Sequence, residues 1–167
     1  LVACMIQLSE GLLPPLAELA IRHKPKGHAV QARIYAEDPA VAFQPAPGLL
    51  TQVDFPASTQ QLRIDTWVTA GTEISAKYDP MIAKVIFHDD NRTSAIKGLQ
   101  KALEAIQLYG TATNVSYLAE FLQEEAFISA KLATSLLTHF EPQLNGIRVH
   151  RAGTFSTVQD FPGRVGY

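Results

Sequence analysis

The sequence predicts an α+β fold in which a small antiparallel β-sheet packs with α-helices that follow it in the chain. Two observations carry this prediction. Apolar and polar residues alternate with a period of two over residues 28–36, and short turns separate the further strand candidates, which favours antiparallel pairing. Beyond about residue 90 the apolar residues recur at helical spacing instead.

The first strand is expected over residues 28–36, where apolar residues alternate with polar ones. Neighbouring side chains of a strand point to opposite faces, so Arg33 is placed on the polar face. Three further segments rich in β-branched and aromatic residues are predicted as strands, namely 49–55, 61–68 and 81–88.

Three helices are predicted to follow. The first is amphipathic, begins at Asp90 or Asn91 as N-cap and ends near Gly110. Asn114 is expected to cap the second helix. The inward residues of these two helices and of a third over about 132–140 are Ile96, Leu99, Leu103, Ile106, Val115, Leu118, Phe121, Leu122, Leu132, Leu136, Leu137 and Phe140.

Shorter elements flank this region. Residues 1–10 and 16–21 have helical spacing, and 141–146 are expected to form a linker. Residues 147–150 and 155–159 resemble strands that open another domain. Neither end of the chain looks finished, so we expect a fragment of a longer polypeptide.

Composition excludes several classes of protein. The 167 residues carry 14 Lys+Arg and 16 Asp+Glu, a net charge of -2, which argues against a strongly basic nucleic-acid binder. Cys4 alone cannot form an internal disulfide, which favours a reducing, cytoplasmic location. No apolar run is long enough to span a bilayer, so no membrane partner is expected.

Few residues stand out as carriers of chemistry. The sequence has no glycine-rich phosphate loop, no nucleophile elbow and no His/Cys cluster at metal spacing. Arg33 is the best single candidate, because a guanidinium offers a fixed charge and a planar fork of donors to an oxyanion. On pattern alone an ordinary surface arginine is the favoured interpretation. Asp79, in Tyr78-Asp79-Pro80, is likewise more typical of a turn than of a binding site.

Four segments, in order, resemble signatures of biotin carboxylases. They are GHAVQARIYAEDP (27–39), FQPAPG (43–48), YDPMIAK (78–84) and GTATN (110–114). The resemblance implies the C-terminal domain of a biotin carboxylase over residues 25–141. It makes 1–24 the end of the preceding ATP-grasp region with a connector, and 142–167 a linker with the start of a further domain.

Two other segments resemble one branch of this family. IDTWV (64–68) with GTE (71–73) is similar to the urea carboxylases, called urea amidolyases where an allophanate hydrolase is fused. Residues 153–167 resemble the opening of their carboxyltransferase domain, which is related to allophanate hydrolase subunit 2. The expected partners are therefore the ATP-grasp core, the carboxyltransferase and the biotin carrier domain of one polypeptide.

The resemblance also implies an activity. In this family ATP and bicarbonate yield carboxyphosphate, which carboxylates biotin on a carrier domain, and urea then accepts the carboxyl group to give allophanate. Arg33 falls on the arginine that holds the ureido oxygen of biotin as it gains enolate character. Tyr78 and Asp79 lie near that pocket, and Thr134 and Ser135 match a segment on the nucleotide side.

The Mg²⁺ ligands, the bicarbonate-binding residues and the phosphate-covering loop are expected outside this chain, so no metal site is assigned here. We accordingly expect the isolated chain to be inactive. Two alternatives stay open: a non-catalytic scaffold that forms a homodimer, or the same domain from an acyl-CoA or pyruvate carboxylase.

Overall fold

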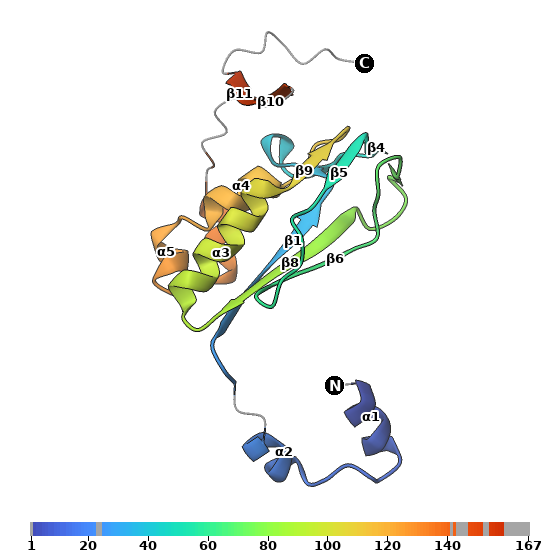
Figure 1. Ribbon diagram of the computed structural model, residues 1–167, viewed down its shortest axis with the longest axis vertical. Coiled ribbons are helices and arrows are strands. Elements are labelled where there is room, and N and C mark those ends of the chain that lie inside the picture. Colours follow the sequence, from blue (N-terminus) through green and yellow to red (C-terminus); the bar gives the residue numbers. More distant parts are fainter. Residues whose placement is uncertain (1, 23–24, 141, 143–146, 152–153, 159–167) are drawn as a thin grey trace.

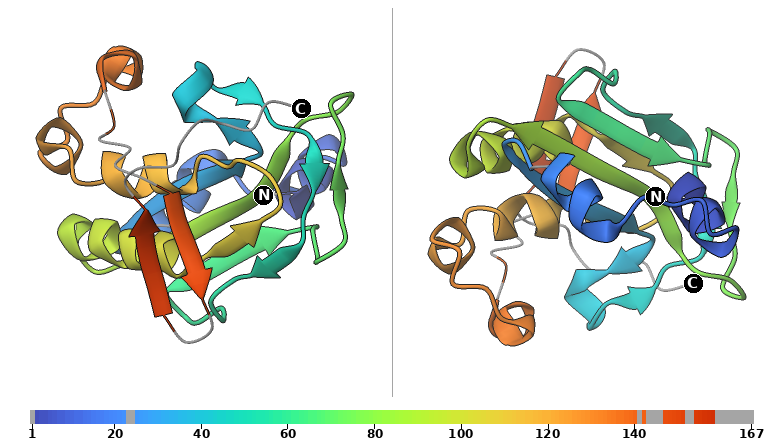
Figure 2. Two further views of the ribbon diagram at one scale, coloured as in Figure 1. Left: turned by 90° about the horizontal axis from the view of Figure 1, so that it is seen from above. Right: turned by 90° about the horizontal axis from the view of Figure 1, so that it is seen from below.

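The computed structural model describes residues 2–22, 25–140, 142, 147–151 and 154–158. At its centre is a three-stranded antiparallel sheet whose strands lie side by side in the order β1-β8-β6 (Figures 1 and 2). These strands are β1 (His28–Tyr35), β8 (Met81–Asp89) and β6 (Leu62–Thr66). The antiparallel sheet predicted from the sequence is confirmed.

The alternation in β1 produces the two faces that the sequence predicts. Val30, Ala32 and Ile34 are buried, whereas Gln31 and Arg33 between them are exposed. The pairing of β1 with β8 shifts register between Ile34 and Tyr35. Arg33 therefore lies on the outer face of the sheet, one residue before this irregularity.

Helix α3 (Arg92–Ala105) packs against β1 and β8 and closes the core (Figure 1). The predicted N-cap is confirmed, since Asn91 Oδ1 accepts a hydrogen bond from the Ser94 backbone N–H at 2.9 Å. Such a cap stabilises a helix by about 1 kcal/mol. The apolar stripe buries Ala95, Ile96, Leu99, Ala102 and Leu103.

The predicted end of this helix near Gly110 is wrong. The backbone is already extended at Ile106, and strand β9 (Gln107–Tyr109) pairs with β5 (Gln52–Asp54). Pairing with a distant strand satisfies the backbone groups of β9 and overrides the local helical pattern.

The prediction for the second helix is right in position and wrong in its cap. Helix α4 (Val115–Phe121) follows Asn114 directly, but the Asn114 side chain makes no capping hydrogen bond. Its side chain bonds to β1 instead, as described below.

The third predicted helix is not an α-helix. Thr134–His139 form a 3₁₀ helix, η2, and a short helix α5 (Glu125–Ile128), which the sequence analysis did not predict, precedes it. Leu132 and Leu137 are exposed, 56% and 49%. With three residues per turn instead of 3.6, the apolar residues no longer share one stripe.

Short two-stranded ladders complete this part of the molecule. The single strand predicted over 49–55 is two strands in the structure, interrupted at Leu50 and Thr51. The remaining elements are β2 (Glu37–Asp38) with β3 (Gln44–Pro45), β4 (Gly48–Leu49) with β7 (Glu73–Ile74), and the 3₁₀ helix η1 (Pro39–Val41).

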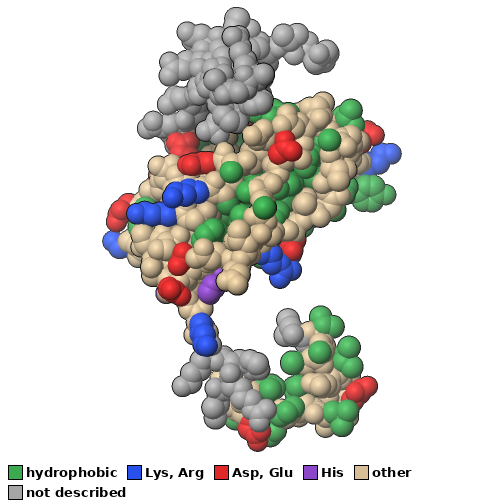
Figure 3. Space-filling model, viewed as in Figure 1, with side chains coloured by type: hydrophobic (Ala, Val, Ile, Leu, Met, Phe, Trp, Pro, Cys, Tyr) green, Lys and Arg blue, Asp and Glu red, His purple; other side chains and the backbone are tan. Residues whose placement is uncertain are grey.

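The flanking predictions are confirmed as elements. Helices α1 (Val2–Ser9) and α2 (Leu16–Arg22) precede the sheet, and β10 (Ile147–Arg151) pairs with β11 (Thr154–Val158). Apolar side chains of α1 are exposed and gather on its surface (Figure 3). Most of the predicted linker 141–146 lies outside the described residues. Within the described part of the chain, no helix is long and apolar enough to cross a membrane.

Candidate functional site at the end of strand β1

Segments far apart in the sequence meet at the C-terminal end of β1. The Ala36 N–H donates to the Pro80 carbonyl at 2.9 Å, and the Ala46 N–H donates to the Ala36 carbonyl at 2.8 Å. The Asn114 N–H donates to the Tyr35 carbonyl at 3.2 Å. Tyr35 and Ala36, within the segment 27–39, therefore bind all three of the other family segments, namely 43–48, 78–84 and 110–114.

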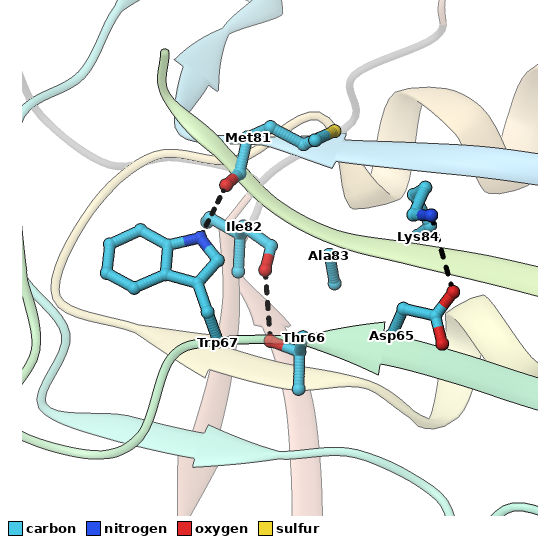
Figure 4. A pocket seen from close by; sticks show the side chains of 7 residues that line it. All are labelled: Asp65, Thr66, Trp67, Met81, Ile82, Ala83 and Lys84. Atoms are coloured by element: carbon cyan, nitrogen blue, oxygen red, sulfur yellow. Dashed lines mark hydrogen bonds and ion pairs between the residues drawn. The ribbon is translucent and has the colours of Figure 1, made fainter. Parts of the chain in front are cut away.

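Arg33 stands close to this meeting point, in a row of charged residues that crosses the sheet. Lys84 of β8 is its direct partner in the register, and Asp65 of β6 is the partner of Lys84. Directly opposed residues project from the same face of a sheet. The Lys84 ammonium lies 3.4 Å from Asp65 Oδ2, a pair drawn in Figure 4.

The carboxylate of this row is already engaged. Asp65 also accepts a hydrogen bond from Arg63 Nε at 2.9 Å, and these two cations hold the pKa of Asp65 below its ordinary value. The side chain of Arg33 forms no hydrogen bond or ion pair with any residue that the structure describes. Its fixed charge and its fork of donors are thus open to an acceptor from outside these residues.

Tyr78 and Asp79 flank the same strand end. Tyr78 is 81% exposed, and Asp79 Oδ1 accepts a hydrogen bond from the Met81 N–H at 2.9 Å. This bond across two residues is the turn that the sequence favoured for Asp79. Because Pro80 is bonded to Ala36, the turn is nevertheless held beside the end of β1.

Glu37 follows β1 directly and is influenced by this turn. Partial burial raises the pKa of Glu37, and the negative charge of Asp79 raises it further. The neighbouring Asp38 has a different role, since its Oδ1 accepts from the Ala40 N–H at the start of η1. A pair of like charges, Glu37 and Asp79, therefore lies at the strand end.

The raised pKa of Glu37 implies that the free energy of unfolding depends on pH. A carboxyl whose pKa is higher in the folded state binds its proton more tightly there, so stability falls as pH rises from the unfolded value, near 4.5, through the folded value. Glu37→Gln is expected to remove this fall and to make the protein more stable than the wild type at pH 7. Urea denaturation from pH 3.5 to 7.5 measures the difference.

Asp79→Asn is the matched control for Glu37→Gln. It keeps the acceptor for the Met81 N–H and removes only the charge, which lowers the folded-state pKa of Glu37, so the Glu37-dependent fall should be smaller and should end at a lower pH. Identical pH profiles for wild type and Glu37→Gln would show that the proton on Glu37 has no influence on folding.

Thr134 and Ser135 lie elsewhere. Both are exposed in η2, which is attached to α4 through a hydrogen bond from the Tyr117 hydroxyl to the Leu137 carbonyl at 3.4 Å. Among the described residues, no hydrogen bond or ion pair connects either of them to Arg33, Tyr78 or Asp79. Arg33, Tyr78 and Asp79 are thus gathered around one strand end, and the nucleotide-side pair is not part of that group.

A shallow hollow of about 230 Å³ adjoins the charged row between β6 and β8 (Figure 4). Trp67 borders it, with its indole N–H donating to the Met81 carbonyl at 2.9 Å. Arg33 does not line this hollow. The described residues contain no group of three or more His, Cys, Asp or Glu suited to a metal ion.

Asn114 has a different role from the helix cap that its place in the sequence predicts. An asparagine just before a helical pattern is typical of an N-cap, and no local signal separates that role from a bond to a distant strand. Lys84 was also missed, although the alternation in β8 places it on the polar face. Only the register of the strands shows that it lies opposite Arg33.

Comparison with known proteins shows the family to which the chain belongs. The family model for the biotin carboxylase C-terminal domain matches residues 31–139. Urea amidolyase of Lachancea kluyveri is 46% identical over 141 residues, which are 84% of this chain and 8% of that protein.

Two solved structures share the fold. The urea carboxylase of Kluyveromyces lactis is 39% identical with a TM-score of 0.75, over 99% of this chain and 14% of that one. The biotin carboxylase domain dimer of the 2-oxoglutarate carboxylase of Hydrogenobacter thermophilus, in complex with MgADP and bicarbonate, is 28% identical with a TM-score of 0.65, over 68% of this chain and 25% of that one. The chain thus spans about a tenth of the length of its urea amidolyase relative. With the family model matching well over half of its residues, it belongs to the biotin carboxylase C-terminal domain family.

Proposed function

We propose that this chain forms the C-terminal part of the biotin carboxylase centre of a urea carboxylase or urea amidolyase, and that Arg33 binds the ureido oxygen of biotin. One observation carries the proposal. Three segments converge on the end of the strand that bears Arg33, and the guanidinium of Arg33 points outward without a carboxylate partner among the described residues.

The residues present fit this ligand. A ureido oxygen is a neutral acceptor that would gain negative charge as the adjacent ring nitrogen gives up its proton to a base, and a preorganised cation stabilises such charge most where it develops. Biotin, when bound, supplies the nitrogen that accepts the carboxyl group. Arg33 orients the ureido group and stabilises the charge, while the excess of cations over the single carboxylate in the row of Arg33, Lys84 and Asp65 favours an electron-rich ligand.

ATP, Mg²⁺ and bicarbonate belong to the same proposal, with their ligands on parts of the polypeptide other than this chain. The Hydrogenobacter relative, whose structure contains MgADP and bicarbonate, supports this assignment. Thr134 and Ser135 on η2 would lie toward the nucleotide. On this view the chain by itself does not turn over, because all the reactants have to be placed together.

Urea is proposed as the final acceptor. Identity is 46% to a urea amidolyase and 39% to a urea carboxylase, but 28% to a 2-oxoglutarate carboxylase domain. The proposed polypeptide is cytoplasmic and supplies an ATP-grasp core, a biotin carrier and a carboxyltransferase, whose first residues would be 153–167.

A second candidate function is that of a non-catalytic scaffold which pairs with another copy. The dimer named for the Hydrogenobacter domain favours it. The two functions differ in their response to ligand. Self-association of a scaffold is insensitive to biotin, whereas a catalytic centre requires biotin for turnover.

The test uses the full-length polypeptide that contains this chain. Bicarbonate-dependent ATP cleavage is measured with urea, an acyl-CoA, pyruvate or 2-oxoglutarate as acceptor. We expect stimulation by urea alone. Stimulation by another acceptor would overturn the urea assignment and keep the carboxylase. No cleavage with any acceptor, together with biotin-insensitive dimerisation, would support the scaffold instead.

A further inference from the structure

Asn114 is the one residue with a polar side chain, tyrosine aside, that is buried in the described part of the chain, with 6% of its surface exposed. Both ends of its side-chain amide form a hydrogen bond with β1. Asn114 Oδ1 accepts from the Tyr35 N–H at 2.9 Å, and Nδ2 donates to the Arg33 carbonyl at 3.2 Å. Together with the bond from the Asn114 N–H to the Tyr35 carbonyl, this makes three hydrogen bonds to two residues of one strand.

These bonds lie on the open edge of β1. In the order β1-β8-β6, β1 has a neighbouring strand on one side only, and an edge strand leaves its N–H and carbonyl groups unpaired on the other. Arg33 and Tyr35 are two residues apart, so their backbone groups point to the same edge. Asn114 acts there as a substitute for a second neighbouring strand.

The position of this contact is specific. The ladder between β1 and β8 shifts its register between Ile34 and Tyr35, one residue beyond Arg33. Where the pairing with β8 becomes irregular, Asn114 provides a second attachment that bridges the irregularity from Arg33 to Tyr35. The strand around Arg33 is thus held from both sides, by β8 and by Asn114.

The loop that carries Asn114 is itself anchored to the same strand end. The Thr111 hydroxyl donates to the Ala46 carbonyl, and the Ala46 N–H donates to the carbonyl of Ala36, the residue after β1. Hydrogen bonds therefore link Ala36 to Ala46 and Ala46 to Thr111, and the chain continues from Thr111 to Asn114, which bonds back to β1. This closed path fixes Asn114 relative to the strand.

Arg33 needs such support more than other residues of the sheet. Lys84 and Arg63 are both oriented by Asp65, whereas the Arg33 side chain has no partner among the described residues. The position of its guanidinium in the free protein then depends on where the backbone places its Cα and Cβ atoms. Small errors of placement are costly in catalysis, since a displacement of about 1 Å reduces rates by as much as 100-fold.

We propose that Asn114 is a positioning residue for Arg33, which holds the backbone of β1 so that the guanidinium meets its ligand. The inference rests on the proposed function of Arg33 in biotin carboxylation. It assigns to Asn114 a role in the reaction, although the asparagine touches neither substrate nor cofactor.

The first experiment measures the backbone directly, without activity. Amide ¹⁵N order parameters of residues 33–35 are compared in wild type, Asn114→Ala and Asn91→Ala versions of this chain. Asn91 is the matched control, because its side chain also accepts one backbone N–H, at the start of α3. We expect values near 0.85 in wild type and Asn91→Ala, and values near 0.6 in Asn114→Ala. Unchanged order in Asn114→Ala, or an equal fall in both variants, overturns the proposal.

The second experiment is a double-mutant cycle in the full-length polypeptide. With free biotin as substrate, Asn114→Ala is expected to lower kcat at least 10-fold and to leave the KM for ATP within 2-fold. In an Arg33→Ala background the same change should reduce the rate less than 2-fold, because the group that Asn114 positions is gone. Equal losses in both backgrounds would show a general effect on folding and contradict the proposal.

Asn114→Asp keeps the experiment informative if the alanine variant does not fold. It retains the acceptor for the Tyr35 N–H and places a second oxygen against the Arg33 carbonyl, so it should show the same non-additivity with Arg33→Ala. Failure of the proposed function has a different signature. In that case Arg33→Ala alone leaves carboxylation intact, while the order parameters still decide whether Asn114 holds the strand.

Discussion

Replacing Arg33 with alanine in the full-length polypeptide is expected to lower the carboxylation of biotin by about 100-fold or more. Removal of a single preorganised donor from a developing oxyanion has an effect of this size. Arg33 lies on the exposed face of an edge strand, so the protein should stay folded. The rate of carboxybiotin formation and the binding of ATP are measured side by side, and ATP binding should not change.

Arg63→Ala is the control for this change. Arg63 belongs to β6 of the same sheet, its side chain is 71% exposed, and its charge is paired with Asp65. We expect the rate of biotin carboxylation by Arg63→Ala to lie within about 2-fold of the wild-type rate, since an exposed ion pair contributes little to stability. Arg33→Lys should fall between the two, because a lysine keeps the charge and loses the planar fork. A loss in Arg63→Ala equal to that in Arg33→Ala would remove any special role of Arg33.

Replacing Gly110 with alanine is expected to destabilise the fold by at least about 3 kcal/mol. Gly110 has φ of +108°, a conformation that costs other residues about 1–3 kcal/mol. A Cβ atom there would also collide with the Leu49 carbonyl oxygen and would stand 2.8 Å from the Thr51 nitrogen. These are backbone atoms of the last residue of β4 and of the connection between β4 and β5, so the loop that carries Asn114 would have to move.

Gly71→Ala separates strain from collision. Gly71 has a similar φ of +89°, but nothing lies within 4 Å of the position its Cβ would take. Its substitution should therefore cost only the backbone strain, about 1–3 kcal/mol. The free energies of unfolding of both variants come from urea denaturation. If Gly110→Ala were no less stable than Gly71→Ala, the close approach of Gly110 to Leu49 would not matter for the fold.

The parts of the fold that the sequence predicted correctly are those whose pattern is set by burial on one face. The alternation in β1 and the helical stripe of α3 both face the core, so the polar side of β1, and with it the exposure of Arg33, could be read from the residues. The end of α3 could not be predicted from the sequence, because it is set by the pairing of β9 with β5, whose residues are more than 50 positions apart. Local preference gives way to such long-range pairing.

The site was predictable to a smaller extent. Pattern alone favoured a surface arginine at Arg33. Arg33 is a candidate for ligand binding because Asp65 is already paired with Lys84 and Arg63, and this pairing follows only from the register of the strands. The role of Asn114 was hidden for a related reason. Its position before a helix pointed to a cap, whereas its partners, Arg33 and Tyr35, lie about 80 residues earlier in the chain.

Chemical modification of Arg33 shows whether biotin binds where the geometry places it. The full-length polypeptide is treated with phenylglyoxal, which reacts with exposed arginines, and modification at Arg33 and Arg63 is followed by mass spectrometry with and without saturating biotin. We predict that biotin slows modification of Arg33 several-fold and leaves Arg63 unaffected. Modification of Arg33 at the same rate with and without biotin would contradict its assignment to the ureido oxygen.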